Sequence, residues 1–122
     1  MSTTYGLHRA LLLNRKGVAI SFEQRSRTWG EVGDRVARLA GALQGLGVGK
    51  GDRVAVLMLN QDRYIELYMA VAWAGAVIVP LNIRWSAIEN EDAVRDCRPK
   101  ALFVDAAFAG MGATIAGKVD GL

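Results

Sequence analysis

Short apolar runs alternate with longer helix-like patterns along most of the chain, and this order predicts an α/β fold. Residues 54–59 form an apolar run of strand length, and residues 77–79 form a second one that ends at Pro80. Between them, Tyr64–Ala74 is apolar almost all round, which is typical of a helix buried on most sides. Strand, helix and strand with short connections predict a βαβ unit with parallel strands and a right-handed crossover.

The strongest amphipathic pattern comes before this unit. Thr28 and Glu31 have the spacing of a capping box, in which each side chain bonds the backbone N–H of the other residue. Apolar residues then recur with helical period as far as Leu46, so we expect a helix that ends at Gly45 or Gly47. Its opposite face carries acids one turn before bases, at the spacing of i,i+4 ion pairs: Glu31 with Arg35, and Asp34 with Arg38.

The N-terminal region gives shorter patterns. Leu7–Leu13 predicts a short helix, and Val18–Phe22 predicts a strand. Gln24–Arg27 is interpreted as a turn that leads into a short partner strand at Thr28.

The C-terminal third contains one more helix and one more strand. A second capping box starts a helix over Ala87–Cys97, and Ala101–Asp105 is a further apolar strand. Ala106–Leu122 is rich in Ala and Gly, so we expect a weak helix there or none. The capping residues are Ser86 and Glu89, and the residues expected to face inward are Ile88, Val94 and Cys97.

These elements predict a partial doubly wound sheet of three parallel strands with flanking helices. The expected strands are Arg53–Leu59, Ala76–Leu81 and Ala101–Asp105. A length of 122 residues corresponds to one domain at most, and 52% hydrophobic with 22% charged residues is usual for a globular chain. No apolar run reaches the roughly 18 residues that a membrane-spanning helix needs.

Charge is unevenly distributed along the chain. Residues 1–53 hold nine Lys/Arg and four Asp/Glu, a net +5, whereas residues 54–122 hold six and eight, a net −2. A basic first half could face nucleic acid or acidic lipid. We favour solvated helix faces, because no basic cluster is interleaved with aromatic residues. We therefore expect no nucleic-acid partner and at most a peripheral membrane contact.

Cys97 and His8 are the only cysteine and the only histidine. A single cysteine allows no intrachain disulfide, which fits a reducing compartment and a cytoplasmic location. Because His8 lies far away in sequence, we interpret Cys97 as a small hydrophobic residue rather than a nucleophile.

The glycines at positions 45, 47, 49 and 51 resemble those of a phosphate-binding loop. Such a loop must follow a strand and open a helix, so that the N–H groups of the helix face the anion. Here the order is reversed, because the glycines follow a helix and precede a strand. We therefore predict a left-handed helix cap and a tight turn.

Two polar loops follow the carboxyl ends of the first two expected strands, where α/β folds place ligands. Asn60 begins the first loop, and we favour it as the N-cap of the helix that follows. Arg84 lies in the second loop and could hold a carboxylate or a phosphate. The structural alternative, that Arg84 ties down its own loop, is the one we favour.

An ordered series of short motifs also carries a family resemblance. The series consists of Gly45–Val48, Gly51–Ala55, Asn60, Ala74–Ala76 and Val79–Arg84. It resembles the N-terminal part of the adenylate-forming enzymes, a superfamily of acyl-CoA synthetases, peptide-synthetase adenylation domains and luciferases. Asn82–Ser86 is most similar to bacterial fatty-acyl-CoA synthetases, and the resemblance extends from about Leu7 to Asp105.

This resemblance implies that residues 1–122 are an N-terminal fragment of an acyl-CoA synthetase. The intact enzyme would join a fatty or related carboxylic acid to CoA, with ATP and Mg²⁺, through an acyl-adenylate. The implied partners are the remainder of the synthetase chain and the acid, and a homodimer is allowed. The alternative is a free-standing small α/β binding or interaction domain without catalysis.

The family's phosphate loop, its acidic ATP-site motifs and its catalytic lysine match no residue of this chain. We therefore assign no catalytic, cofactor-binding or metal-ligating residue, and we expect the isolated chain to be inactive. No role is assigned to His8, Arg84 or Cys97.

Overall fold

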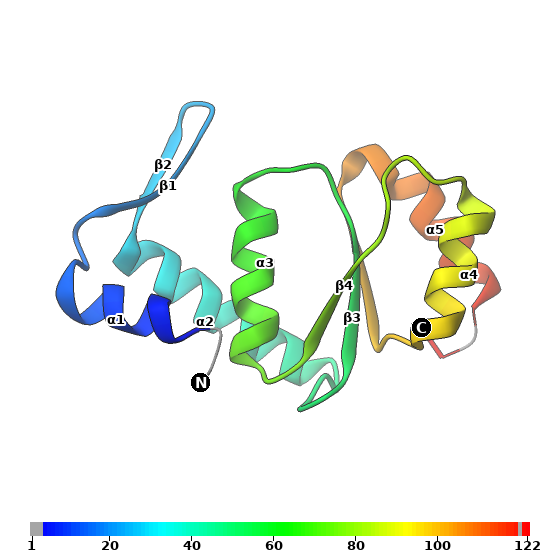
Figure 1. Ribbon diagram of the computed structural model, residues 1–122, viewed down its shortest axis with the longest axis horizontal. Coiled ribbons are helices and arrows are strands. Elements are labelled where there is room, and N and C mark those ends of the chain that lie inside the picture. The colour runs from blue at the N-terminus through cyan, green and yellow to red at the C-terminus, as the bar shows by residue number, and fades with distance from the viewer. Residues whose placement is uncertain (1–3, 120) are drawn as a thin grey trace.

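The computed structural model describes residues 4–119 and 121–122. Its centre is a parallel sheet of three strands in the order β4-β3-β5, shown in Figure 1. The strands are β3 (Arg53–Leu57), β4 (Val77–Pro80) and β5 (Ala101–Val104). Val54 of β3 lies opposite both Ile78 of β4 and Ala101 of β5. The prediction of three parallel strands is confirmed, although each strand is shorter than expected at one or both of its ends.

Helices cover both faces of this sheet, as a doubly wound fold requires. Figure 1 shows α2 (Trp29–Gly45) and α3 (Asp62–Trp73) on one side, with α4 (Ala87–Cys97) and α5 (Ala109–Lys118) on the other. The alternation of β3 explains why both faces are covered. Val54 and Val56 enter the core under α2 and α3, whereas Ala55 and Leu57 enter the core under α4 and α5.

The N-terminal part of the chain adds a helix and a hairpin. Helix α1 (Tyr5–Leu13) packs on α2, and β1 (Val18–Phe22) pairs antiparallel with β2 (Arg25–Thr28). The hairpin projects beyond the end of α3 (Figure 1). The predicted turn at Gln24–Arg27 is wrong, because the chain turns at Glu23 and Gln24 and the two arginines belong to β2.

Both predicted capping boxes are confirmed. Thr28 Oγ1 accepts from the Glu31 N–H at 3.2 Å, and Glu31 Oε1 accepts from the Thr28 N–H at 3.0 Å. Ser86 and Glu89 make the same reciprocal pair at the start of α4. Helix α4 begins and ends at the predicted residues, Ala87 and Cys97.

The glycine-rich segment closes α2 as predicted. Gly47 has φ +88°, its N–H donates to the Gln44 carbonyl, and the Val48 N–H donates to the Leu43 carbonyl. These two bonds define a Schellman motif, which favours glycine at the left-handed position. Gly51, at φ +79°, then makes the turn into β3.

Side-chain directions on two helices differ from the expectation. The i,i+4 pairs of α2 do not form, since Arg35 donates to Glu66 of α3 and Asp34 pairs with Arg15. On α4, Val94 is buried as predicted, but Ile88 is 68% exposed and Asn90 takes the buried position. The Asn90 Nδ2 donates to the Asn82 carbonyl, whereas its Oδ1 is buried without a partner among the described residues.

The C-terminal segment, for which a weak helix or none was expected, forms a short 3-10 turn (Ala106–Phe108) and then α5. Ile115 is fully buried against the sheet. A Cβ at Gly112 would lie 2.9 Å from Val104 Cγ1, so glycine allows α5 to approach β5 closely. Across the part of the chain that the structure describes, we find no helix both long and apolar enough to cross a membrane.

Candidate functional site

The loops after the three parallel strands meet at the carboxyl edge of the sheet, where α/β folds bind ligands. Asp105 Oδ2, directly after β5, accepts from the Leu59 N–H at 2.8 Å and joins two of these loops. Asn82 Oδ1 accepts from the Arg84 N–H at 2.9 Å in the third loop. The loops are therefore fixed by their own Asp and Asn side chains.

Two residues singled out from the sequence lie at this edge. Asn60 is exposed and is not the N-cap of α3, because Gln61 occupies that position without a side-chain cap bond. Arg84 is exposed, and within residues 4–119 and 121–122 its guanidinium has no hydrogen bond or ion pair. The structure thus gives no support for Arg84 as a tie within its own loop, and its guanidinium is available to an anion.

The described residues offer no cluster of metal ligands at this edge. Within that part of the chain, no group of three or more His, Cys, Asp or Glu residues could hold a metal ion. Within the described residues, Asp105 Oδ1 and Asn90 Oδ1 are buried without a hydrogen-bond partner. The exposed guanidinium of Arg84 could contact a polar ligand, but one arginine could not enclose it.

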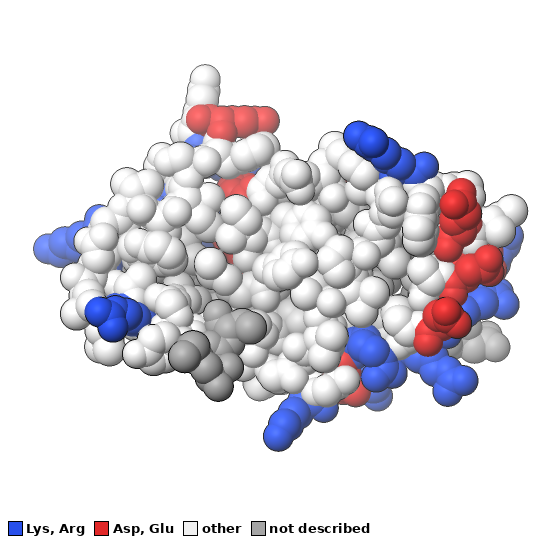
Figure 2. Space-filling model, in the orientation of Figure 1, with Lys and Arg blue, Asp and Glu red and all other residues white. Residues whose placement is uncertain are grey.

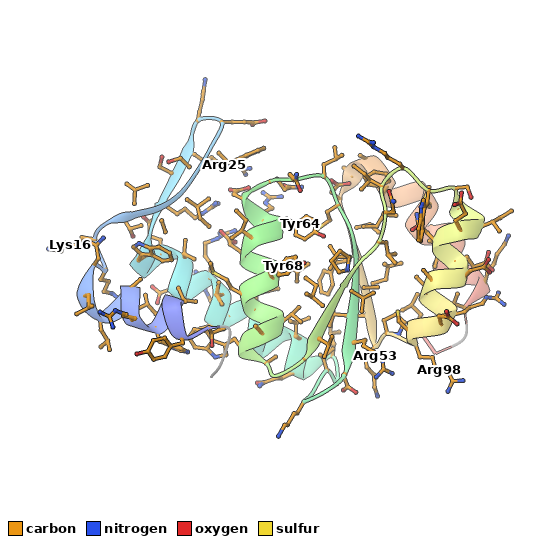
Figure 3. The ribbon with its side chains drawn as sticks, in the orientation of Figure 1. Lys16, Arg25, Arg53, Tyr64, Tyr68 and Arg98 are labelled. Carbon is orange, nitrogen blue, oxygen red and sulfur yellow. The ribbon has the colours of Figure 1, made fainter. Side chains whose placement is uncertain are left out.

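A large apolar groove lies between α3, the exposed side of β4 and the hairpin. Its volume is about 1030 Å³. Tyr64 and Tyr68, whose rings stack 5.6 Å apart, lie on the side of α3 that faces β4 (Figure 3). Figure 2 shows that the centre of this face is largely uncharged. The residues lining the groove are mainly apolar and include Ile20, Phe22, Tyr64, Ile65, Tyr68, Met69, Val77 and Ile78.

An ion cluster that joins β2, α2 and α3 adjoins the groove through Asp62, which also lines it. Its members are Arg25, Arg27, Arg35, Asp62 and Glu66. Arg25 Nη2 donates to Asp62 Oδ1 at 2.9 Å, and Arg27 Nη1 donates to Asp62 Oδ2 at 2.5 Å. Arg35 Nε lies 2.9 Å from both oxygens of Glu66. Asp62 is 1% exposed and Glu66 is 3% exposed, so both carboxylates are buried.

The pKa of Asp62 reflects two opposing effects. Burial raises this pKa, whereas hydrogen bonds from Arg27 and from the Arg63 N–H, with the charges of both β2 arginines, lower it. The net effect places the pKa of Asp62 below its ordinary value of 3.8. Asp62 is therefore ionised at neutral pH and is suited to an ion pair rather than to proton transfer.

His8 lies in α1 and Cys97 ends α4, and these helices lie at opposite ends of the molecule (Figure 1). Cys97 is half-buried, and its burial raises the pKa of the thiol, which disfavours a nucleophilic thiolate. The His8 ring packs against Trp73, with ring centroids 4.6 Å apart. Neither residue lines the apolar groove.

Sequence reasoning missed the groove and the ion cluster. The groove could not be found, because one of its walls is the hairpin, which is distant in the chain from α3 and β4. The cluster did leave a signal, since Asp62 and Glu66 are the only charges on the inward side of an otherwise apolar helix. Two buried acids one turn apart need basic partners, and the arginines of β2 were available.

Comparison with known proteins assigns the chain to a family. Residues 8–120 match the family described as "AMP-binding enzyme", and the chain belongs to that family. It is 37% identical over 99 residues to the 2-succinylbenzoate–CoA ligase of Arabidopsis thaliana, covering 81% of this chain and 18% of that protein. It is 40% identical over 99 residues to the long-chain-fatty-acid–CoA ligase of Thermus thermophilus, covering 79% of this chain and 18% of that protein.

Solved structures agree with this assignment. A candidate long-chain-fatty-acid CoA ligase from Rhodopseudomonas palustris superimposes on the whole chain with a TM-score of 0.95 and 29% identity, and 31% of it is covered. An anthranilate CoA ligase bound to anthranoyl-AMP gives a TM-score of 0.94 and 27% identity, with 24% of it covered. The fold is therefore that of the N-terminal domain of adenylate-forming enzymes. The chain spans about a fifth of the length of its curated relatives, 18% in the two cases above.

Proposed function

We propose that this chain is the N-terminal part of an ATP-dependent acyl-CoA synthetase. The whole enzyme would activate a fatty or related carboxylic acid as an acyl-adenylate and transfer the acyl group to CoA. The observation that carries the proposal is the family match over residues 8–120, together with relatives that are CoA ligases.

The class of acid is left broad because the relatives differ in the acids they are named for. Their names include a long-chain fatty acid, 2-succinylbenzoate and anthranilate. All three are carboxylic acids, so the shared chemistry is attack of a carboxylate on ATP. Fatty acids are the first substrates to test, because Asn82–Ser86 resembles the bacterial fatty-acyl-CoA synthetases.

Within such an enzyme the described residues would act as scaffold. ATP, Mg²⁺ and CoA would be held mainly by residues beyond this chain, because the described residues form no metal cluster and no glycine-rich loop between a strand and a helix. The fixed loops at the carboxyl edge, with the free guanidinium of Arg84, would form one wall of the active-site region.

The test is to read the coding DNA beyond the Leu122 codon and to express the complete reading frame. We expect a Ser/Thr/Gly-rich lysine loop downstream, and carboxylate-dependent ATP–pyrophosphate exchange by the purified product. A panel of fatty and aromatic acids then identifies the substrate. A stop codon directly after Leu122, or a complete product that is inactive with every acid, would favour the small binding domain.

The isolated chain provides the second part of the test. Purified residues 1–122 should show no exchange above a blank, because no residue of the chain matches the phosphate loop or the catalytic lysine. Measured exchange by this chain would contradict the assignment of all catalytic groups to other residues.

A further inference from the structure

We propose that the ion cluster is a releasable contact that holds the hairpin β1–β2 against α3 and thereby sets the shape of the apolar groove. This inference concerns the described residues alone and does not depend on the proposed ligase activity.

The hairpin presents one face to the groove and to α3. Ile20 lies opposite Arg27 and Phe22 lies opposite Arg25, so these four side chains share one face of the hairpin. The other face carries Ser21 and Ser26, whose exposed hydroxyls bond each other at 2.9 Å. The hairpin therefore lines the groove with two apolar residues of β1 and bonds Asp62 of α3 through two arginines of β2.

Such a hairpin is not stable by itself. An isolated two-stranded sheet is marginal in water, and its position depends on what it packs against. At its base, Ile20 is buried in the main core. Near its tip, Phe22 is only half-buried, and the polar contact of Arg25 with Asp62 holds this part. The outer half of the hairpin is thus held mainly by the cluster.

The burial of the two carboxylates makes this contact cooperative. A buried carboxylate without its cation is strongly unfavourable, and water can replace an arginine only if the site opens. Loss of Arg27 leaves Asp62 with one arginine and removes the 3.4 Å contact between Arg27 and Glu66. The structure relieves this cost by moving the hairpin away from α3 so that water reaches the acids.

The groove changes with the hairpin because they share a wall. Ile20 and Phe22 of β1 line one side, and Tyr64 and Tyr68 of α3 line another. Displacement of β1 would widen the groove and expose its apolar lining. The cluster therefore couples a polar contact beside the groove to the accessibility of the groove's apolar part.

Arg35 supplies a matched control within the cluster. It bonds Glu66 at 2.9 Å, the distance at which Arg25 bonds Asp62, but it belongs to α2. Removing it disturbs the buried acids without cutting the hairpin from α3. Arg15, in an exposed pair with Asp34 at 3.5 Å, is a control for loss of a surface charge.

The experiment is amide hydrogen exchange on the chain 1–122, comparing wild type with Arg27→Gln, Arg35→Gln and Arg15→Gln. For Arg27→Gln we expect amides of β1 and β2 to exchange at least about tenfold faster, with much smaller changes in β3. Binding of a hydrophobic dye should rise in the same variant. Arg35→Gln and Arg15→Gln should not accelerate the hairpin selectively.

Equal acceleration of the hairpin and β3 in Arg27→Gln, or no acceleration of either, would overturn the proposal. If Arg27→Gln does not fold, hydrogen exchange of the wild-type chain still tests the proposal. Its hairpin amides should exchange through an opening that depends less on denaturant than the opening of β3. Identical denaturant dependence for the two groups would mean that the hairpin opens only with global unfolding, and would also overturn it.

Discussion

At the scale of single residues, Asp62 links the local and the tertiary structure of this fold. It is the first residue of α3, where a negative charge is favourable next to the free N–H groups of the helix. Its Oδ1 accepts both from the Arg63 N–H and from Arg25, and its Oδ2 accepts from Arg27. One buried side chain therefore starts the helix and anchors the hairpin.

This arrangement predicts how stability depends on pH. The pKa of folded Asp62 lies below the unfolded value of 3.8, so ionised Asp62 stabilises the fold above that value. The stabilisation is lost as the pH falls from 3.8 through the lower folded pKa. Asp62→Asn should cost about 2 kcal/mol near pH 7, from lost charged hydrogen bonds, and progressively less below about pH 4.

Urea unfolding of the wild type and of Asp62→Asn across this pH range measures the difference. Asp34→Asn is the control, since Asp34 is exposed and its carboxylate forms one ion pair among the described residues, with Arg15. A difference between wild type and Asp62→Asn that stays constant at every pH would show that ionisation of Asp62 does not stabilise the fold.

Substitution of glycine by alanine should change the stability in opposite directions at two positions of the chain. A Cβ added at Gly41 or Gly47 would meet nothing within 4 Å, so packing does not distinguish them. Gly47 has φ +88°, and Gly47→Ala should destabilise by about 1–2 kcal/mol. Gly41 lies inside α2, and Gly41→Ala should stabilise by about 0.5–1 kcal/mol. Chemical denaturation of both variants tests the pair, and a change of the same sign in both would contradict it.

At the scale of elements, local signals predicted the boundaries that local contacts determine. The capping boxes at Thr28 and Ser86 and the Schellman motif at Gly47 placed α2 and α4 almost to the residue. The errors arose where a contact with a residue distant in the sequence determines the local structure. Arg35 lacks its helical partner because Glu66 of α3 binds it. The segment with the two arginines of β2 was predicted as a turn, because the local sequence does not reveal that both arginines bond Asp62 from a strand.

The candidate site was less predictable than the fold for the same reason. Asn60 had the properties of a local cap, yet α3 begins one residue later than a cap at that position would allow. The groove depends on how a hairpin, a helix and an edge strand are placed relative to one another. No spacing in the sequence encodes that placement directly.

The capping box of α2 gives a prediction at this scale. Thr28→Ala should destabilise the chain by about 1 kcal/mol, because the N–H of Glu31 loses its acceptor. Thr28→Ser keeps the hydroxyl and should restore most of the stability. Thermal melts of the three proteins measure the difference in stability. A Thr28→Ala midpoint equal to that of the wild type would show that the cap does not stabilise the chain.

At the scale of the whole molecule, apolar surface is concentrated on the face formed by α3 and β4. Val77 and Ile65 are 48% and 46% exposed, and both line the groove. β4 is also an edge strand, and it carries no Lys or Arg that would discourage pairing with another chain. The apolar sequence of α3 predicted a helix buried on most sides, but Ile65 and Tyr68 are 46% and 44% exposed, because the sheet covers only one side of the helix.

This face should make the chain 1–122 self-associate and bind hydrophobic dye, because large exposed apolar patches mark interaction or aggregation sites. Sedimentation at several concentrations should show a mass that rises with concentration. The double variant Ile65→Lys, Val77→Lys should lower both association and dye binding, since it places two charges on the rim of the groove. Leu12→Lys is the matched control, because Leu12 is 86% exposed on α1 and does not line the groove. If the wild-type chain is a compact monomer that binds no dye, the groove does not mediate self-association and the free-standing domain becomes the better interpretation. If Leu12→Lys lowers association as much as the double variant does, the net charge of the chain rather than this face controls association.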